Sequence, residues 1–166
     1  PQNQNYCKGA VVPEHIFNST PPGSTISWTN SNSAIGLPAS GTGAIPSFIA
    51  SNNTNSAITA TINITPSLNG CPGQTYTFTI TVNPLPSVTG PGSSVVCAGE
   101  TISAGNLISN IPTTTYSWTN SNTTIGLPAS GTGNIPSFIA TNSSGSAISA
   151  TITIVPSLNG CAGTPI

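Results

Sequence analysis

Residues 27–50 read SWTNSNSAIGLPASGTGAIPSFIA, and residues 117–140 repeat this stretch as SWTNSNTTIGLPASGTGNIPSFIA. The two copies differ at three positions and are offset by 90 residues, and the same offset carries Cys7 onto Cys97 and Cys71 onto Cys161. Solenoid repeats have periods of roughly 20–50 residues, so a period of this length indicates complete small domains. We therefore expect the chain to consist of two tandem copies of one domain.

Within each copy, the hydrophobic pattern is that of β-strands. Every second residue is apolar in residues 58–64 (ITATINI), 148–154 (ISATITI) and 77–82 (TFTITV). Alternation at this period predicts strands with one buried face, and no segment has the periodicity of a helix. An all-β unit of about 90 residues has the size of an immunoglobulin-like β-sandwich. The predicted fold is therefore all-β, with two tandem immunoglobulin-like β-sandwich domains.

A proline-rich stretch, residues 83–92 (NPLPSVTGPG), lies between the two copies. Three prolines cannot belong to a central strand, and proline-rich connectors act as semi-stiff spacers. We place the domain boundary here, with residues 1–86 as the first repeat and residues 87–166 as the second.

Each copy contains one tryptophan, Trp28 or Trp118, in a segment with strand alternation. An inward-facing tryptophan on an early strand is a usual core anchor of a sandwich, so we expect both to be buried. The recurring Phe48 and Phe138 are expected to pack in the same cores. The alternative is that each tryptophan lies on the surface and stacks on sugars.

Four cysteines at equivalent positions of the two copies predict a disulfide framework. We expect the bonds Cys7–Cys71 and Cys97–Cys161, because each then stays inside one folding unit. A zinc site is not expected, since the chain has no CxxC pair and only one histidine. Disulfides predict a secreted protein outside the cytoplasm.

The charged residues are too few for most kinds of chemistry. The chain has one lysine, two glutamates and one histidine, and its net charge is −1. Nucleic-acid binding needs clustered Lys and Arg, and a membrane span needs about 18 consecutive apolar residues; neither is present. Glu14-His15 is the only adjacent pair of a carboxylate and a histidine and is not repeated, so we expect no catalytic residues, no metal site and no cofactor.

The two copies differ after their second cysteine. Residues 77–82 form a good final strand after Cys71, whereas only AGTPI comes after Cys161. We expect the second sandwich to lack this strand and to expose an unpaired edge and an open apolar core. Two explanations stay open: the chain is an excerpt of a longer array that supplies the strand, or a neighbouring subunit donates it.

Four segments of the second copy carry a resemblance to a known family: CAGE (97–100), TYSWTN (115–120), PSFIA (136–140) and SLNGC (157–161). They resemble the PKD-like repeats of large secreted proteins of Bacteroidota, which are similar to repeats of gliding-motility and surface adhesins exported by the type IX pathway. Ordinary PKD domains continue Tyr-x-Trp with Phe-Gly-Asp-Gly, whereas this chain has Thr-Asn-Ser-Asn at that place. The resemblance implies a sandwich within a long array that forms a stalk, adhesin or filament without catalysis.

Two functions are compatible with these features. The first is a non-catalytic structural module of an extracellular surface fibre, with neighbouring repeats or copies of the same protein as partners. The alternative is a ligand-binding module that recognises a surface glycan or ice through strand faces or loops rich in Thr, Ser and Asn. Outward threonines are ordinary on exposed strands, and repeated exposed aromatic residues are absent from the sequence pattern, which favours the first.

Overall fold

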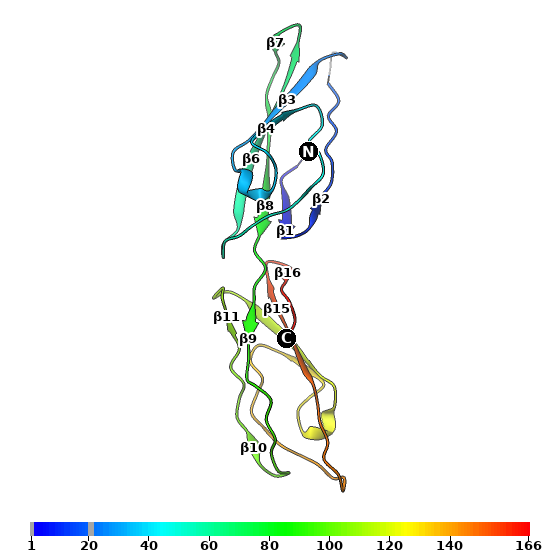
Figure 1. The fold of residues 1–166 in the computed structure, drawn as a ribbon, viewed down its shortest axis with the longest axis vertical. Helices are drawn as coiled ribbons and strands as arrows, with labels where there is room; N and C mark the ends of the chain where they lie inside the picture. Colours follow the sequence, from blue (N-terminus) through cyan, green and yellow to red (C-terminus); the bar gives the residue numbers. More distant parts are fainter. Residues whose placement is uncertain (1, 20–21) are drawn as a thin grey trace. The chain divides into compact units, whose positions relative to one another are not determined.

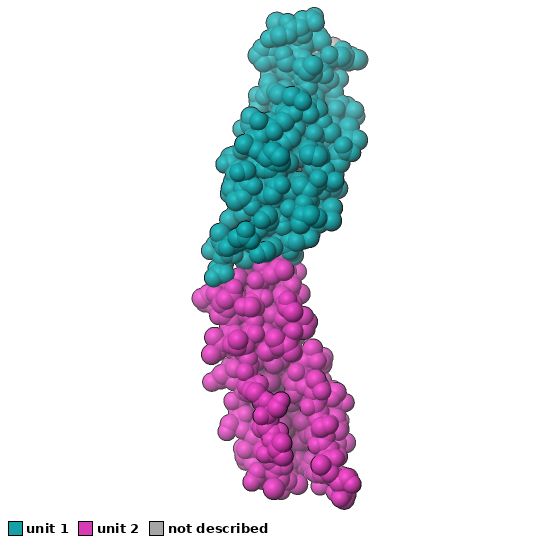
Figure 2. All heavy atoms as spheres, viewed as in Figure 1, with its two compact units in different colours: residues 1–84 teal, residues 85–166 magenta. Residues whose placement is uncertain are grey.

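The computed structural model describes residues 2–19 and 22–166. The chain divides into two compact units, Pro1–Pro84 (unit 1) and Leu85–Ile166 (unit 2), which Figures 1 and 2 distinguish. The boundary falls two residues before the one predicted from the sequence. The all-β fold is confirmed: the described residues form strands and two single-turn 3₁₀ helices, η1 (Ser33–Ile35) and η2 (Thr123–Ile125).

Unit 1 is built around one sheet with the strand order β1-β8-β6-β3-β4, in which β7 also pairs with β6. A small second sheet pairs β2 with β5, and its Val12 and Phe48 pack in or against the same core. The strands of unit 1 are β1 (Gln4–Cys7), β2 (Val11–Val12), β3 (Thr25–Asn30), β4 (Ser40–Thr42), β5 (Phe48–Ile49), β6 (Ile58–Leu68), β7 (Cys71–Pro72) and β8 (Tyr76–Asn83).

The alternation of β6 and β8 explains how this sheet forms a core. Three alternate apolar residues of each strand are buried, and Ile62 of β6 lies opposite Phe78 of β8 in an antiparallel ladder. The buried residues are Ala60, Ile62 and Ile64 of β6 and Phe78, Ile80 and Val82 of β8. The threonines between them face outward, where Thr59 and Thr81 are joined by a hydrogen bond of 2.9 Å between their hydroxyl oxygens. Burial of one face thus fixes the register, because a slip by one residue would turn every apolar side chain to solvent.

Unit 2 repeats this plan with a smaller sheet of order β13-β12-β15-β16, accompanied by the pairs β10–β14 and β11–β9. Trp118 of β12 lies opposite Ile154 of β15, as Trp28 lies opposite Ile64 in unit 1. The strands of unit 2 are β9 (Val88–Thr89), β10 (Thr101–Ile102), β11 (Ile108–Ser109), β12 (Thr115–Asn120), β13 (Ser130–Thr132), β14 (Phe138–Ile139), β15 (Ile152–Leu158) and β16 (Cys161–Ala162).

Two expectations about local structure need correction. The stretch 83–92 is not wholly a connector, because β9 pairs with β11 and Val88 is buried in the core of unit 2. The strand predicted over residues 148–154 begins only at Ile152, although the equivalent β6 begins at Ile58. In unit 1, residues 58–61 pair with β8, and the described part of unit 2 holds no equivalent strand.

Candidate functional site

The two tryptophans and two phenylalanines that the sequence singled out lie in or against the cores. Trp28 and Trp118 are only 3% and 4% exposed, and Phe48 and Phe138 are partly buried against the same clusters. Each indole ring lies over a glycine of the neighbouring strand, Gly41 in β4 or Gly131 in β13. Neither indole can therefore stack on a sugar, and both indole N–H groups are buried without a hydrogen-bond partner.

The expected disulfides Cys7–Cys71 and Cys97–Cys161 are not formed. Cys71 and Cys97 are free and exposed, whereas Cys7 and Cys161 are disulfide-bonded. In unit 1, Cys7 lies beside Asn83 at one end of the sheet, and Cys71 lies beside Leu68 at the other. The eleven residues of β6 run between these ends, and ten steps of about 3.3 Å span roughly 33 Å, whereas a disulfide needs Cα atoms within about 7 Å.

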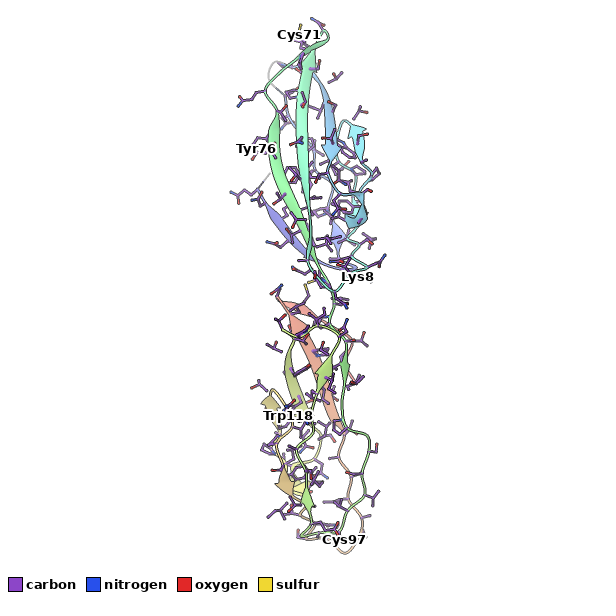
Figure 3. The ribbon with its side chains drawn as sticks, turned by 90° about the vertical axis from the view of Figure 1, so that its left-hand side faces the viewer. Lys8, Cys71, Tyr76, Cys97 and Trp118 are labelled. Carbon is purple, nitrogen blue, oxygen red and sulfur yellow. The ribbon has the colours of Figure 1, made fainter. Side chains whose placement is uncertain are left out.

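Unit 2 holds its two cysteines at the equivalent places. The amide of Gly99 donates to the carbonyl of Ala140 as Gly9 donates to Ala50, and Cys161 faces Leu158 as Cys71 faces Leu68. Figure 3 labels Cys97 at one end of unit 2 and Cys71 at the tip of the β6–β7 hairpin in unit 1. Disulfide-bonded cysteines are typical of proteins outside the cytoplasm.

We expect the chain to carry two thiols that react with iodoacetamide without prior reduction. Both Cys71 and Cys97 are exposed, so each peptide should be fully alkylated within the native protein. Peptide mapping by mass spectrometry measures this directly, and Cys71→Ser and Cys97→Ser should each remove one equivalent. Recovery of a Cys7–Cys71 or Cys97–Cys161 peptide from non-reduced protein would contradict the arrangement described above.

Glu14 and His15, the one adjacent carboxylate–histidine pair, lie in different environments. Glu14 is exposed, while His15 is half-buried and its Nε2 lies 3.1 Å from Oε1 of Gln4. The imidazole ring packs edge-on against Phe78, with 6.0 Å between ring centroids. Burial lowers the pKa of His15. The described residues hold no group of three or more His, Cys, Asp or Glu side chains that could bind a metal ion.

The shifted pKa of His15 predicts a small dependence of stability on pH. The imidazole of His15 binds a proton less readily in the folded state than in the unfolded state. The contribution of neutral His15 to stability is therefore fully present above the unfolded pKa of about 6.5, and it is lost as the pH falls through the lower pKa of the folded state. We expect unit 1 to melt a few degrees lower at pH 5 than at pH 7.5. His15→Gln should abolish this difference in calorimetry. A shift of the same size in His15→Gln would show that another group is responsible.

Buried asparagines, which the sequence pattern did not single out, stabilise the loops of both units. The side-chain amide of Asn30 donates to the carbonyl of Leu37 (2.8 Å), and its oxygen accepts from the amide of Asn32 (3.0 Å). Asn120 makes the same two bonds in unit 2. The signal available in the sequence was that each asparagine stands two positions after the tryptophan of its unit. Their polar atoms serve the scaffold, because a buried amide must be hydrogen-bonded.

Unit 2 has an open groove of about 640 Å³. Residues 91–96 and 147–152 line this groove, together with apolar residues that include Phe138 and Leu127. Figure 2 shows a hollow in the magenta unit. Uncharged side chains line this groove throughout, so it suits an apolar segment better than an ion or a charged substrate.

The chain was compared with family models, solved structures and curated proteins. A model of the PKD-like domain family matches residues 4–86, which is half of the chain. Among solved structures, the N-terminal Ig1-2 module of the Drosophila receptor protein tyrosine phosphatase DLAR is similar at 16% identity and a TM-score of 0.33, over 99% of this chain and 92% of that one. No curated protein matches the chain.

PKD-like domains are generally non-catalytic extracellular modules. Within residues 2–19 and 22–166, no helix has the length and hydrophobicity that a membrane span requires. The two repeats, the sheet of unit 1 and the matched residues lead to one conclusion: the chain belongs to the PKD-like domain family.

Proposed function

We propose that the chain is a non-catalytic, tension-bearing module of an extracellular fibre or adhesin stalk. The observation that carries this proposal is the parallel pairing of the first and last strands of unit 1. Gln4 of β1 lies opposite Ile80 of β8, and Cys7 lies opposite Asn83. A pull on the two ends of unit 1 acts on these neighbouring strands in opposite directions along their length.

Because the two parallel strands are pulled along their length, the force acts on all hydrogen bonds between β1 and β8 at the same time. The ladder continues beyond the strands, because the amide of Lys8 donates to the carbonyl of Asn83 (2.9 Å) and the amide of Thr79 donates to Oδ1 of Asn3 (3.0 Å). Strands in shear separate only when several bonds break at once, whereas strands pulled apart from one end lose their bonds one at a time. Neighbouring repeats or copies of the same protein are the partners that a fibre requires.

The uncharged outer face of unit 1 also suits a fibre. The threonine hydroxyls there bond to their neighbours, as in the pairs Thr59–Thr81 (2.9 Å) and Thr65–Thr75 (3.0 Å). Hydroxyl groups engaged with one another are less available to a glycan or to ice. A glycan array and an ice-recrystallisation assay test the alternative, and specific binding in either one would favour a ligand-binding module.

Single-molecule force spectroscopy tests the mechanical role. The chain is pulled by its two ends under reducing conditions, because the disulfide-bonded Cys7 and Cys161 would otherwise carry the load past unit 1. Unit 1 should then unfold in one force peak that releases a contour length of roughly 30 nm, at 3.3–3.6 Å per residue. Tyr6→Pro, in the middle of β1, should lower the force of this peak because proline cannot donate to the ladder. Ile49→Ser, at an exposed position outside this sheet, is the matched control. Extension of unit 1 without a peak would overturn the proposal.

A further inference from the structure

The cysteines occupy two kinds of place, and each kind occurs once in each unit. Cys7 and Cys97, the turn cysteines, stand immediately before a tight turn, and Cys71 and Cys161, the hairpin cysteines, follow the turn of a β-hairpin. Cys7 and Cys161 are disulfide-bonded, whereas Cys71 and Cys97, which Figure 3 labels, are free and exposed. Each unit therefore has one bonded place and one open place.

The two hairpin cysteines have the same local structure. In both hairpins the cysteine lies opposite a leucine, across a two-residue turn of asparagine and glycine. Two residues after the cysteine, a glycine amide donates to a proline carbonyl of the long strand, at 2.8 Å in unit 1 and 2.9 Å in unit 2. The bonded Cys161 is 1% exposed, and the free Cys71 is exposed. The hairpin that carries the bonded cysteine is thus already formed around the free one.

The two turn cysteines match in the same way. The carbonyl of Cys7 accepts from the amide three residues later at 3.0 Å, and the carbonyl of Cys97 does so at 3.2 Å. In each unit the glycine two positions after the cysteine has a positive φ and donates its amide to an alanine carbonyl. The turn beside the bonded cysteine is therefore also present beside the free one.

A turn cysteine and a hairpin cysteine cannot bond within one unit. The length of β6 separates the two places of unit 1 by roughly 33 Å, and a disulfide needs Cα atoms within about 7 Å. Two cysteines are bonded and the other two are free, so the disulfide joins the turn cysteine of one repeat to the hairpin cysteine of the next. A surface thiol alone would indicate no partner, but here the equivalent thiols show which kind of place each one bonds.

The connector between the repeats gives this bond a direction. In unit 1, Cys7 lies opposite Asn83 at the end of β8. In unit 2, Gly163, two residues after Cys161, lies against the carbonyl oxygen of Pro86. Asn83 and Pro86 are three residues apart along the chain, which is at most about 11 Å. The bond therefore spans a connector, with the turn cysteine in the earlier repeat and the hairpin cysteine in the later one.

We infer that Cys71 and Cys97 are the two open halves of the same link between repeats. Cys71 forms a disulfide with the turn cysteine of one neighbouring repeat, and Cys97 forms one with the hairpin cysteine of another. This inference rests on the fibre proposed above and names the bond that joins its repeats. Two thiols become one disulfide, and a small disulfide such as oxidised glutathione takes up the two electrons and two protons and becomes two thiols.

The test oxidises an equal mixture of isotope-labelled and unlabelled full chain with oxidised glutathione, and the disulfides are mapped by mass spectrometry. Between chains, we expect the mixed link Cys71–Cys97 to exceed the two like links, Cys71–Cys71 and Cys97–Cys97, together by at least about tenfold. Thiols that meet at random would give mixed and like links in equal amounts. Equal amounts, or a Cys71–Cys97 link formed only within single chains, would overturn the inference.

Single variants separate the two halves. Cys71→Ser and Cys97→Ser each keep one free thiol and should stay monomeric under the same oxidation, because only like links are left to them. An equal mixture of the two variants should form a dimer that does not grow, since neither chain has a second free thiol. Both substitutions are at exposed positions, so both variants should fold. A variant that dimerises with itself as readily as with the other would overturn the inference.

A displaced thiol is the matched control. Ser93 is exposed like Cys97 and lies four residues before it, outside the turn. Ser93→Cys is made in a chain that carries both Cys71→Ser and Cys97→Ser, so that it has one free thiol. This thiol should link to the Cys71 thiol of the Cys97→Ser variant at least about tenfold less than Cys97 does. Equal linking would show that exposure alone decides the reaction, which would overturn the inference.

A longer chain tests the link to a following repeat of the same polypeptide. A second copy of residues 77–166 is added after Ile166, because Ile166 faces Ile154 as Tyr76 faces Ile64. The addition brings two more cysteines, yet the number of thiols that react with iodoacetamide should not rise, because the new hairpin cysteine bonds to Cys97. A rise by two would overturn the assignment of Cys97. The force experiment is done with the disulfides reduced, so either proposal can fail alone.

Discussion

Gly41→Ala should lower the free energy of unfolding of unit 1 by about 3 kcal/mol, because an added methyl group collides with the buried indole of Trp28. The new Cβ atom would lie 2.6 Å from Cε2 of the ring and closer still to Cζ2. The indole cannot move aside, since it is 3% exposed and packed between β4 and the core. For a domain of this size the loss corresponds to roughly 15 °C in melting temperature.

Fluorescence can assign this loss to one unit, because the chain has only two tryptophans, one in each unit. In a Trp118→Phe background, thermal melting is followed through Trp28 alone. Gly131→Ala changes the equivalent position of unit 2 and should leave the Trp28 transition unchanged. Gly145→Ala, where a methyl group meets no atom within 4 Å, should change stability by less than about 0.5 kcal/mol. A Gly41→Ala protein that melts with the parent protein would refute the packing argument.

Hydrogen exchange should separate two segments of almost the same sequence by at least about a hundredfold in rate. Residues 58–60 (ITA) are part of β6 and pair with β8, so their amides exchange only when the sheet opens. Residues 148–150 (ISA) lie outside any described strand, so their amides should exchange at nearly the rate of a loop. Each factor of ten in exchange corresponds to about 1.4 kcal/mol of opening free energy.

Peptide-level mass spectrometry measures both segments in one sample, which removes differences of pH and temperature. The central part of each strand is the control: residues 62–64 and 152–154 pair with β3 and β12, so both should be protected. Equal protection of residues 58–60 and 148–150 would show that unit 2 closes its sheet by some other means.

Much of the fold could be predicted because the residues that alternate as apolar in the sequence are largely the ones that are buried in the structure. The alternation in residues 58–64 and 77–82 predicted β6 and β8, and the burial of Trp28 and Trp118 follows from the same pattern of apolar positions. The roles of Gly41 and Gly131 could not be recognised, because glycine in a loop-like GTG sequence reads as a turn. Only the pairing of β3 with β4 places this glycine under the indole ring.

The cysteine pairing was wrong for a reason of topology. Equivalent positions in two repeats showed that the cysteines belong to a common plan, but sequence separation says nothing about which end of a long strand each occupies. The eleven residues of β6 hold Cys71 far from Cys7, and this distance exists only once β1, β8 and β6 are paired.

By itself the sequence determined the all-β class, the two repeats and the identity of the core strands, because period-two alternation and turn residues are local properties of the chain. The tertiary structure decided which alternating segments become strands. ITATINI forms a strand along its whole length, whereas ISATITI does so only from Ile152, where β12 pairs with it. A strand satisfies its backbone through a neighbour, so the same local pattern remains irregular wherever the neighbouring strand is missing.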